Sequence, residues 1–266
     1  MQLFSDSFSM GLLASLLAGG ATGLGAIPIF VKKDFSRRTL DIMLGFAAGV
    51  MLAASSFSLL VPAFEDAAVV ATGWVGVFTI VGLGFMLGAG FVHLTDRYLP
   101  HEHFQKGPEG PSSSLSRVWL LIIAITIHNF PEGLAVGVSF GGSNIVTGVS
   151  VAVAIGLQNI PEGLAVAAPL VRQGYSRKYA GVLALLTGLV EPIGGLLGVS
   201  VVTFAAGLLP YGLAFAAGAM IFVVGDEMVP ESHSGGNERL ATWGLMIGFI
   251  VMMSLDNVFT FLFEAG

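Results

Sequence analysis

The sequence predicts an all-α membrane protein in which eight transmembrane helices cross the bilayer and both termini are external. Apolar residues make up 55% of the 266-residue chain, charged residues make up only 11%, and the mean hydropathy is +0.86. A soluble domain carries about 25% charged residues. Apolar stretches of about 20 residues recur along the whole chain, and this is the length that a membrane-spanning helix needs. Too little polar surface remains to cover a soluble protein of this size, so that class is excluded.

The whole chain, residues 1–266, is interpreted as a single transmembrane domain. The expected spans run approximately over residues 8–31, 39–64, 72–97, 117–140, 144–171, 179–204, 207–230 and 239–263. No Lys or Arg precedes Lys32, so the first stretch lacks the basic region of a signal peptide and is expected to remain as a span. The longest connection, at about 100–116, is rich in Gly, Pro and Ser and is interpreted as a polar linker.

The basic residues are distributed in a way that fixes the predicted orientation. All eleven fall in or beside alternate connections between the spans. They are Lys32, Lys33, Arg37, Arg38, Arg97, Lys106, Arg117, Arg172, Arg177, Lys178 and Arg239. Because cytoplasmic loops carry an excess of Lys and Arg, these connections are predicted to be cytoplasmic, which places both termini outside. A missed or extra span would scatter the basic residues over both faces, so the number of spans and the orientation support each other.

Spans four and five carry two copies of one motif, 30 residues apart and identical at seven of nine positions. The first copy begins at His128 as His-Asn-Phe-Pro-Glu-Gly, and the second begins at Gln158 as Gln-Asn-Ile-Pro-Glu-Gly. Residues four apart share one face of a helix, which aligns His128 with Glu132 and Gln158 with Glu162. The two spans are joined by a short turn, so they are expected to be antiparallel neighbours whose motifs face each other near the middle of the bilayer.

The prolines of the two motifs predict local distortion of both helices. Pro131 and Pro161 lack the backbone N–H that would bond the carbonyl one turn earlier, so a kink is expected at each. Glycines that follow the glutamates allow neighbouring helices to approach closely. Span six adds a third carboxylate beside a third helix-breaking proline, at Glu191 and Pro192.

The charges at this depth predict a cation site. No Lys or Arg lies near Glu132, Glu162 or Glu191, and a charged side chain at the bilayer centre is costly. These carboxylates are therefore expected to be protonated or to share a cation. One imidazole, three carboxylates and the amides suit a divalent metal such as Zn²⁺, Fe²⁺, Mn²⁺ or Cd²⁺. The chain contains no cysteine, which excludes a thiolate metal site and disulfides.

Other interpretations remain open on the residues alone. The motifs could be plain kinks with buried protonated glutamates, or the glutamates and His128 could form a proton relay. A membrane-embedded di-metal enzyme is a further alternative, although the sequence contains neither His-Glu-x-x-His nor Glu-x-x-His. Glu227 and Glu231, four residues apart, suggest an acidic exit at the cytoplasmic end of span seven or ordinary charges at a helix end. Asp256 in span eight has no evident partner.

The paired motifs are similar to the signature of the ZIP (Zrt/Irt-like) family of divalent metal transporters, and the chain resembles its bacterial members over its whole length. The resemblance implies a binuclear metal site. The principal site would consist of His128, Glu132, Gln158 and Glu162, and the second site of Asn129, Asn159, Glu162 and Glu191, with Glu162 bridging the two. Many family members have His in place of Gln158 and some have Asp in place of Asn159, so metal selectivity could differ and the second site would carry one charge fewer here.

The resemblance also implies a transport pathway. The approach would be lined by Met51, Ala54 and Ser58, with Glu65 and Asp66 at the external mouth. Metal would be received on the cytoplasmic side by Asp96, His101, His103, Asp226, Glu227 and His233. Spans one, four, five and six would slide against spans two, three, seven and eight in an elevator-type motion, and a channel-like facilitator is the alternative.

The predicted function is therefore import of a divalent transition metal into the cytoplasm, with zinc as the first candidate and cadmium, iron and manganese as further ones. The metal is the transported substrate, and no enzyme activity is expected. The expected partners are divalent metal ions, the lipid bilayer and a second copy of the chain in a homodimer, with no nucleic acid. The expected location is the plasma (inner) membrane.

Overall fold

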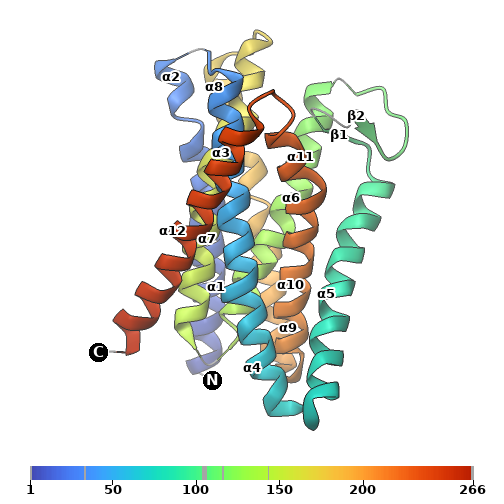
Figure 1. Cartoon of the computed structure of the whole chain (residues 1–266), viewed down its shortest axis with the longest axis vertical. Helices are drawn as coiled ribbons and strands as arrows, with labels where there is room; N and C mark the ends of the chain where they lie inside the picture. The colour runs from blue at the N-terminus through green and yellow to red at the C-terminus, as the bar shows by residue number, and fades with distance from the viewer. Residues whose placement is uncertain (1, 33, 104–106, 116, 143, 265–266) are drawn as a thin grey trace.

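The computed structural model describes residues 2–32, 34–103, 107–115, 117–142 and 144–264, and within them the predicted all-α membrane class is confirmed (Figure 1). Eight helical stretches in the described residues are long and apolar enough to cross a membrane. They are Ser7–Val31, Arg37–Val70, Gly73–Tyr98, Ile122–Ser139, Ile145–Arg172, Arg177–Phe204, Ala206–Ser232 and Glu238–Leu262. The second stretch continues to Val70, six residues beyond its expected end at residue 64.

Four spans are single helices and four are built from shorter segments. The single helices are α5 (Gly73–Tyr98), α6 (Arg117–Ser139), α7 (Ile145–Arg172) and α12 (Glu238–Glu264). The composite spans are α1 (Gln2–Gly25) with α2 (Pro28–Val31); α3 (Arg37–Ala53) with η1 (Ala54–Leu60) and α4 (Val61–Val70); α8 (Arg177–Gly188) with α9 (Glu191–Phe204); and η2 (Ala206–Leu208) with α10 (Leu209–Val223), η3 (Val224–Met228) and α11 (Val229–Ser232).

Prolines account for the irregular points of these helices. The π-helical segments η1 and η3 each precede a helix whose second residue is proline, Pro62 in α4 and Pro230 in α11. Proline cannot donate to the carbonyl one turn earlier, and a wider π-helical turn accommodates this loss. Pro192 is likewise the second residue of a helix, α9, but here span six is interrupted by a turn between Gly188 and Glu191. By contrast, Pro131 and Pro161 lie inside helices that continue through them.

The helices form two bundles, which we call the motif bundle (α1, α2 and α6–α9) and the flanking bundle (α3, α4, α5, α10, α11 and α12 with η1 and η3). Within each bundle, glycines bring backbones into direct contact. In the motif bundle Gly19 of α1 lies against the carbonyl of Gly188, and Gly133 of α6 lies against the backbone of Glu191. In the flanking bundle Gly49 of α3 lies against the backbone of Leu245 in α12. Such contacts leave little room for movement inside a bundle.

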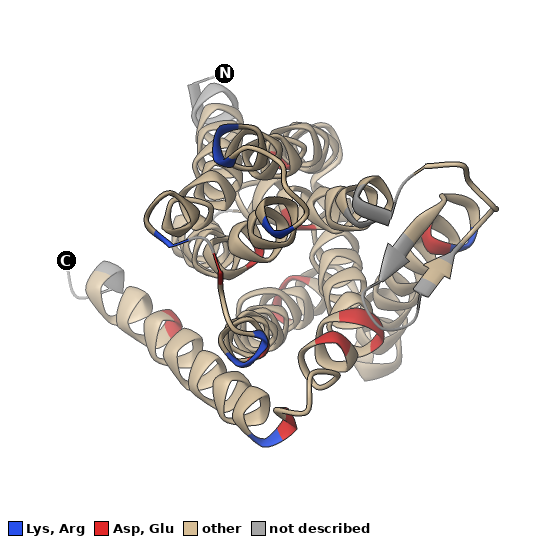
Figure 2. Ribbon diagram, turned by 90° about the horizontal axis from the view of Figure 1, so that it is seen from above, with Lys and Arg blue, Asp and Glu red and all other residues tan. Residues whose placement is uncertain are grey.

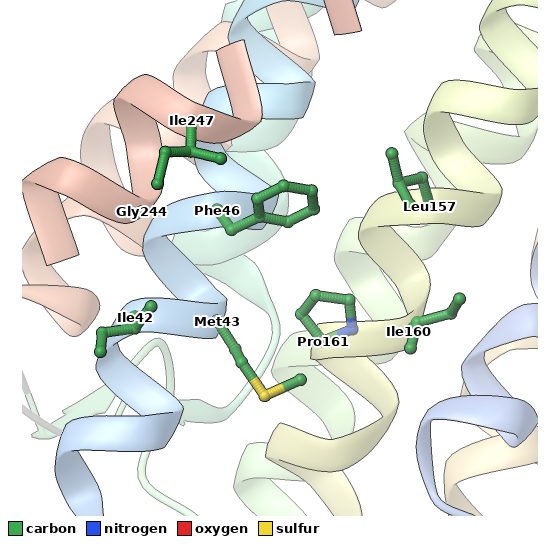
Figure 3. Close-up of a pocket in the computed structure, with 8 residues that line it drawn as sticks. All are labelled: Ile42, Met43, Phe46, Leu157, Ile160, Pro161, Gly244 and Ile247. Atoms are coloured by element: carbon green, nitrogen blue, oxygen red, sulfur yellow. The ribbon is translucent and has the colours of Figure 1, made fainter. Parts of the chain in front are cut away.

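The interface between the bundles is formed by α3 against α7 and by α6 against α10, and it is packed through side chains. Gly212 of α10, for example, meets the side chain of Val138 of α6. An apolar crevice of about 380 Å³ lies at this interface between α3, α12 and α7. Figure 3 shows Met43 and Phe46 of α3 directed across it toward Pro161 and Leu157 of α7. The two bundles are therefore less interlocked than the helices within each of them.

The expected polar linker at about 100–116 contains a small hairpin. Strand β1 (His101–His103) pairs antiparallel with β2 (Gly107–Glu109), with His101 opposite Glu109. Helix α1 begins and α12 ends at the opposite end of the molecule (Figure 1). We call these two ends the hairpin end and the terminal end.

The described basic residues all lie at the hairpin end. Lys32 follows α2, Arg97 is in the last turn of α5, and Arg172 is in the last turn of α7. The others lie at the starts of α3, α6, α8 and α12, which also face the hairpin end because successive spans alternate in direction. In Figure 2, Lys and Arg lie at helix ends and in loops, whereas several Asp and Glu lie among the helices. The positive-inside rule predicts that the hairpin end is cytoplasmic.

Cysteine labelling tests this orientation, and the chain has no native cysteine to interfere. A single cysteine at Ser7, near the start of α1, should react with a membrane-impermeant maleimide added from outside. One at Ser113, beyond β2, should react only after the membrane is permeabilised. A permeant reagent that labels both variants provides the control for expression and reactivity. Labelling of the Ser113 variant from outside in intact cells would contradict the predicted orientation and place the hairpin end outside.

Candidate metal centre

The two motifs meet directly inside the motif bundle. Gln158 Nε2 of α7 donates a hydrogen bond of 2.7 Å to Glu132 Oε1 of α6, and both side chains are buried. The antiparallel arrangement of α6 and α7 produces this contact, because the motifs lie at similar depths on neighbouring helices. A carboxylate of one motif and an amide of the other thus form one polar centre.

The third carboxylate joins this centre through Asn159. Asn159 Nδ2 donates to Glu191 Oε1 at 2.6 Å and to the backbone carbonyl of Ala18 in α1 at 2.8 Å. Glu191 is fully buried and occupies the first turn of α9. The positive end of the helix dipole and the free N–H groups of the first turn favour a negative charge there. The interruption of span six therefore places a carboxylate where a buried anion is best tolerated.

Glu162 of α7 is the remaining motif-bundle carboxylate at this depth. Its side chain is 8% exposed, and it interacts electrostatically with His128, Glu132 and Glu191. It is the one motif carboxylate on α7, and the residues with which it interacts lie on α6 and α9. The bridging role of Glu162 stays a prediction.

Several buried oxygen atoms of the centre accept no hydrogen bond within the described residues. They are Asn129 Oδ1, Glu132 Oε2, Gln158 Oε1, Asn159 Oδ1 and Glu191 Oε2. A buried polar atom without a partner costs about 1–3 kcal/mol. These are carboxylate and amide oxygens of the two motifs and of Glu191, and hydrogen bonds join Gln158 to Glu132 and Asn159 to Glu191. Their chemistry fits a divalent cation, which accepts several oxygen ligands at once.

His128 lies in a second cluster toward the hairpin end. Its Nε2 is 2.6 Å from Glu227 Oε1, and ligand atoms of Asp96, His128 and Glu227 all lie within 4.8 Å of one another. We call these three residues the His128 cluster. They come from α5, α6 and η3, so the cluster joins the motif bundle to the flanking bundle. His128 precedes Glu132 by one helical turn, about 6 Å along α6. It therefore connects the His128 cluster to the centre that contains Glu132.

The expected exit residues are placed differently from one another. His101 is buried, with Nε2 3.8 Å from Asp96 Oδ1 and Nδ1 2.8 Å from the carbonyl of Leu99. It extends the His128 cluster toward the hairpin. Asp226 is half-buried beside Glu227 in η3. The side chain of His103 lies outside the described residues.

Two residues near the proposed exit have structural partners. His233 uses both ring nitrogens, with Nδ1 2.9 Å from the carbonyl of Val229 and Nε2 2.9 Å from Thr242 Oγ1, and so joins α11 to α12. Glu231 Oε1 is 2.8 Å from the guanidinium of Arg37, which also pairs with Asp41 at 2.7 Å. Glu231 is therefore neutralised by a network that fastens α11 to α3.

The expected approach from the terminal end is closed by packing in this conformation. Met51 and Ala54 are buried in the apolar core, and Ser58 is 2% exposed. Glu65 is exposed and Asp66 is half-buried, and both line a small pocket of about 60 Å³ at the terminal end. The carboxylates of Glu65 and Asp66 are thus separated from the metal centre by apolar side chains.

No partner for Asp256 was evident in the sequence, and the structure supplies two. Asp256 Oδ1 accepts hydrogen bonds from Ser58 Oγ at 2.8 Å and from Ser150 Oγ at 2.5 Å. Serines are common in membrane helices and lie in other spans, so no local pattern in the sequence pointed to this contact.

Comparison with known proteins adds independent evidence. A family model described as "ZIP Zinc transporter" matches residues 100–256, which include both motifs, Glu191 and Glu227. Zinc transporter GufA of Myxococcus xanthus is 48% identical over 247 residues, 92% of this chain and 97% of that protein. Zinc transporter ZIPB of Bordetella bronchiseptica is 44% identical over 254 residues, covering 89% and 77%. Zinc transporter ZIP11 of Homo sapiens is 39% identical over 335 residues, covering 94% and 97%.

Proposed function

Because this chain belongs to the ZIP zinc transporter family, we propose that it imports zinc into the cytoplasm through the centre on α6, α7 and α9. It is a multi-pass membrane protein and a transporter rather than an enzyme. The observation that carries the proposal is the set of buried carboxylate and amide oxygens on the two motifs and on Glu191 that accept no hydrogen bond in the part of the chain that the structure describes. An oxygen-rich site of this kind also accommodates cadmium, iron and manganese, which are proposed as competing substrates.

We propose that the centre holds two metal ions. The first is bound by Glu132, Gln158, Glu162 and His128, and the second by Asn129, Asn159, Glu162 and Glu191. The hydrogen bonds between Gln158 and Glu132 and between Asn159 and Glu191 support this division, because each joins members of one proposed site. Metal replaces these bonds with metal–oxygen contacts as it enters.

Release toward the hairpin end proceeds through the His128 cluster. His128 shares a helical face with Glu132 and lies 2.6 Å from Glu227, so it can pass metal from one carboxylate to the other. His101 next to Asp96 provides the following step. Ligands spaced about one helical turn apart allow the ion to move without losing all of its ligands at once.

The arrangement of the helices supports an elevator-type motion. Each bundle is tightly connected through glycine-mediated backbone contacts, whereas the interface between them consists of side-chain contacts and the crevice in Figure 3. Sliding of the motif bundle against the flanking bundle would carry the metal centre between the two sides. We further propose that the protein acts as a homodimer in the plasma (inner) membrane, with the hairpin end in the cytoplasm.

Isotope transport in proteoliposomes tests the function. Radioactive zinc should enter in a saturable manner, and cadmium should compete with it. For an elevator, unlabelled zinc inside the vesicles should accelerate entry of the isotope by about twofold or more, because the loaded carrier returns faster than the empty one. A channel-like facilitator would show no acceleration. Uptake no faster than in protein-free liposomes would contradict the proposed function altogether.

A further inference from the structure

A hydrogen bond to the carboxylate of Asp256 crosses the interface between the bundles, on the terminal side of the metal centre. Asp256 of α12 accepts hydrogen bonds through one oxygen from Ser150 of α7 and from Ser58 of η1, at 2.5 Å and 2.8 Å. The two serine oxygens are 3.4 Å apart, and both serines are buried. Hydrogen bonds from a hydroxyl to an ionised carboxylate are among the shortest and strongest in proteins.

The three residues belong to different bundles. Asp256 and Ser58 lie in the flanking bundle, and Ser150 lies in the motif bundle. Ser150 precedes Gln158 by eight residues on one continuous helix, so it stands about 12 Å from the metal centre in the direction of the terminal end. The bond between Ser150 and Asp256 therefore crosses the surface along which the bundles are proposed to slide.

The hydrogen bond from Ser150 to Asp256 stabilises the conformation in which it forms, because Asp256 lies in a membrane-spanning helix. A carboxylate within a membrane-spanning helix is costly unless polar groups satisfy it. Ser58 stays beside Asp256 during any motion of the motif bundle, whereas Ser150 moves with α7. Displacement of α7 by one helical turn, about 5.4 Å, removes one of the two donors from the carboxylate.

We propose that Ser150 and Asp256 form a latch that holds the terminal side of the bundle interface closed, and that its release accompanies opening of the metal centre toward that side. The latch is a gating contact of the chain itself and requires no metal ligand role for Asp256. The proposal rests on the proposed sliding motion, but it makes a prediction about conformation that is independent of zinc.

A buried reporter cysteine tests the latch. Ala154 of α7 is fully buried in a cluster with Ala53, Ala54 and Met252 at the interface, one turn from Ser150. In the variant Ala154→Cys, the rate of alkylation by a small maleimide added at the terminal end reports how often this interface opens. Addition of Ser150→Ala should raise the rate by about tenfold, since a hydrogen bond to a charged group is lost from the closed state only.

Ser58→Ala is the matched control. It removes a hydrogen bond of 2.8 Å to the same oxygen of Asp256 within the flanking bundle, and across the interface only the longer 3.4 Å contact with Ser150, so the alkylation rate should rise by no more than about threefold over the parent reporter. Asp256→Asn weakens the bond across the interface and should raise the rate, and it takes the place of Ser150→Ala if that variant elutes as an aggregate. An unchanged rate with Ser150→Ala, or equal increases with both serine variants, would overturn the latch.

Zinc uptake measured on the same variants separates this proposal from the proposed function. If the parent transports zinc and Ser150→Ala leaves the alkylation rate unchanged, the latch is wrong and the transport function stands. If the parent transports no zinc and Ser150→Ala still accelerates alkylation, the latch stands and the proposed function is wrong.

Discussion

Replacement of Glu162 by Gln should abolish zinc uptake in protein that is correctly inserted in the membrane. The substitution preserves the volume of the side chain and its capacity for hydrogen bonding, and it removes only the charge. Glu162 is buried, interacts electrostatically with His128, Glu132 and Glu191, and is proposed to contact both metal ions. Loss of a charged ligand shared by two sites should lower uptake by at least about tenfold, which corresponds to about 1.4 kcal/mol.

Two further variants distinguish the loss of a ligand shared by both sites from the loss of a ligand of the second site alone. Asn159→Ala and Glu191→Ala affect chiefly the second site, so both should retain measurable uptake with an altered rate or metal preference. Uptake of zinc and cadmium is measured for the four proteins at matched expression, with insertion checked by the labelling assay. Near-parental uptake by Glu162→Gln would show that the motif glutamates only shape the helices, and would remove the bridging role from the mechanism.

The contact between the two motifs could be predicted from the sequence because the information for it is local. The two copies of the motif place His128, Glu132, Gln158 and Glu162 by helical periodicity, and a short turn makes their helices neighbours. The structure adds the hydrogen bond between Gln158 and Glu132. A repeated motif on adjacent antiparallel spans leaves few alternative arrangements, so the pairing of the helices followed from the pattern.

The contacts between the bundles could not be predicted in this way. Glu227 lies 99 residues from His128, and Asp256 lies 106 residues from Ser150, so no periodicity connects them. Glu227 and Ser58 also lie in π-helical segments, whose wider turns shift the faces that a regular helix would present. Helical spacing alone grouped Glu227 with Glu231, whereas Glu231 pairs with Arg37.

His128 connects the metal centre to Glu227, and this leads to a prediction about zinc affinity and a second one about the rate of uptake. His128 interacts electrostatically with Glu162, and its Nε2 lies 2.6 Å from Glu227 Oε1. If it both binds metal in the first site and passes it on, His128→Ala should lower zinc affinity and the rate of uptake, each by about tenfold or more. Glu227→Gln should slow uptake by about fivefold to tenfold while zinc affinity of the centre stays within about twofold, because only release is affected.

Equilibrium binding to detergent-solubilised protein and initial uptake rates in proteoliposomes measure the two parts separately. Glu238→Gln is the matched control, because it removes an exposed carboxylate at the same end of the molecule, at the start of α12, and should leave both quantities at parental values. Equal losses of affinity in His128→Ala and Glu227→Gln would place Glu227 in the first site itself. Parental uptake by Glu227→Gln would instead remove the His128 cluster from the route, since metal would then leave the centre without passing the carboxylate that His128 contacts.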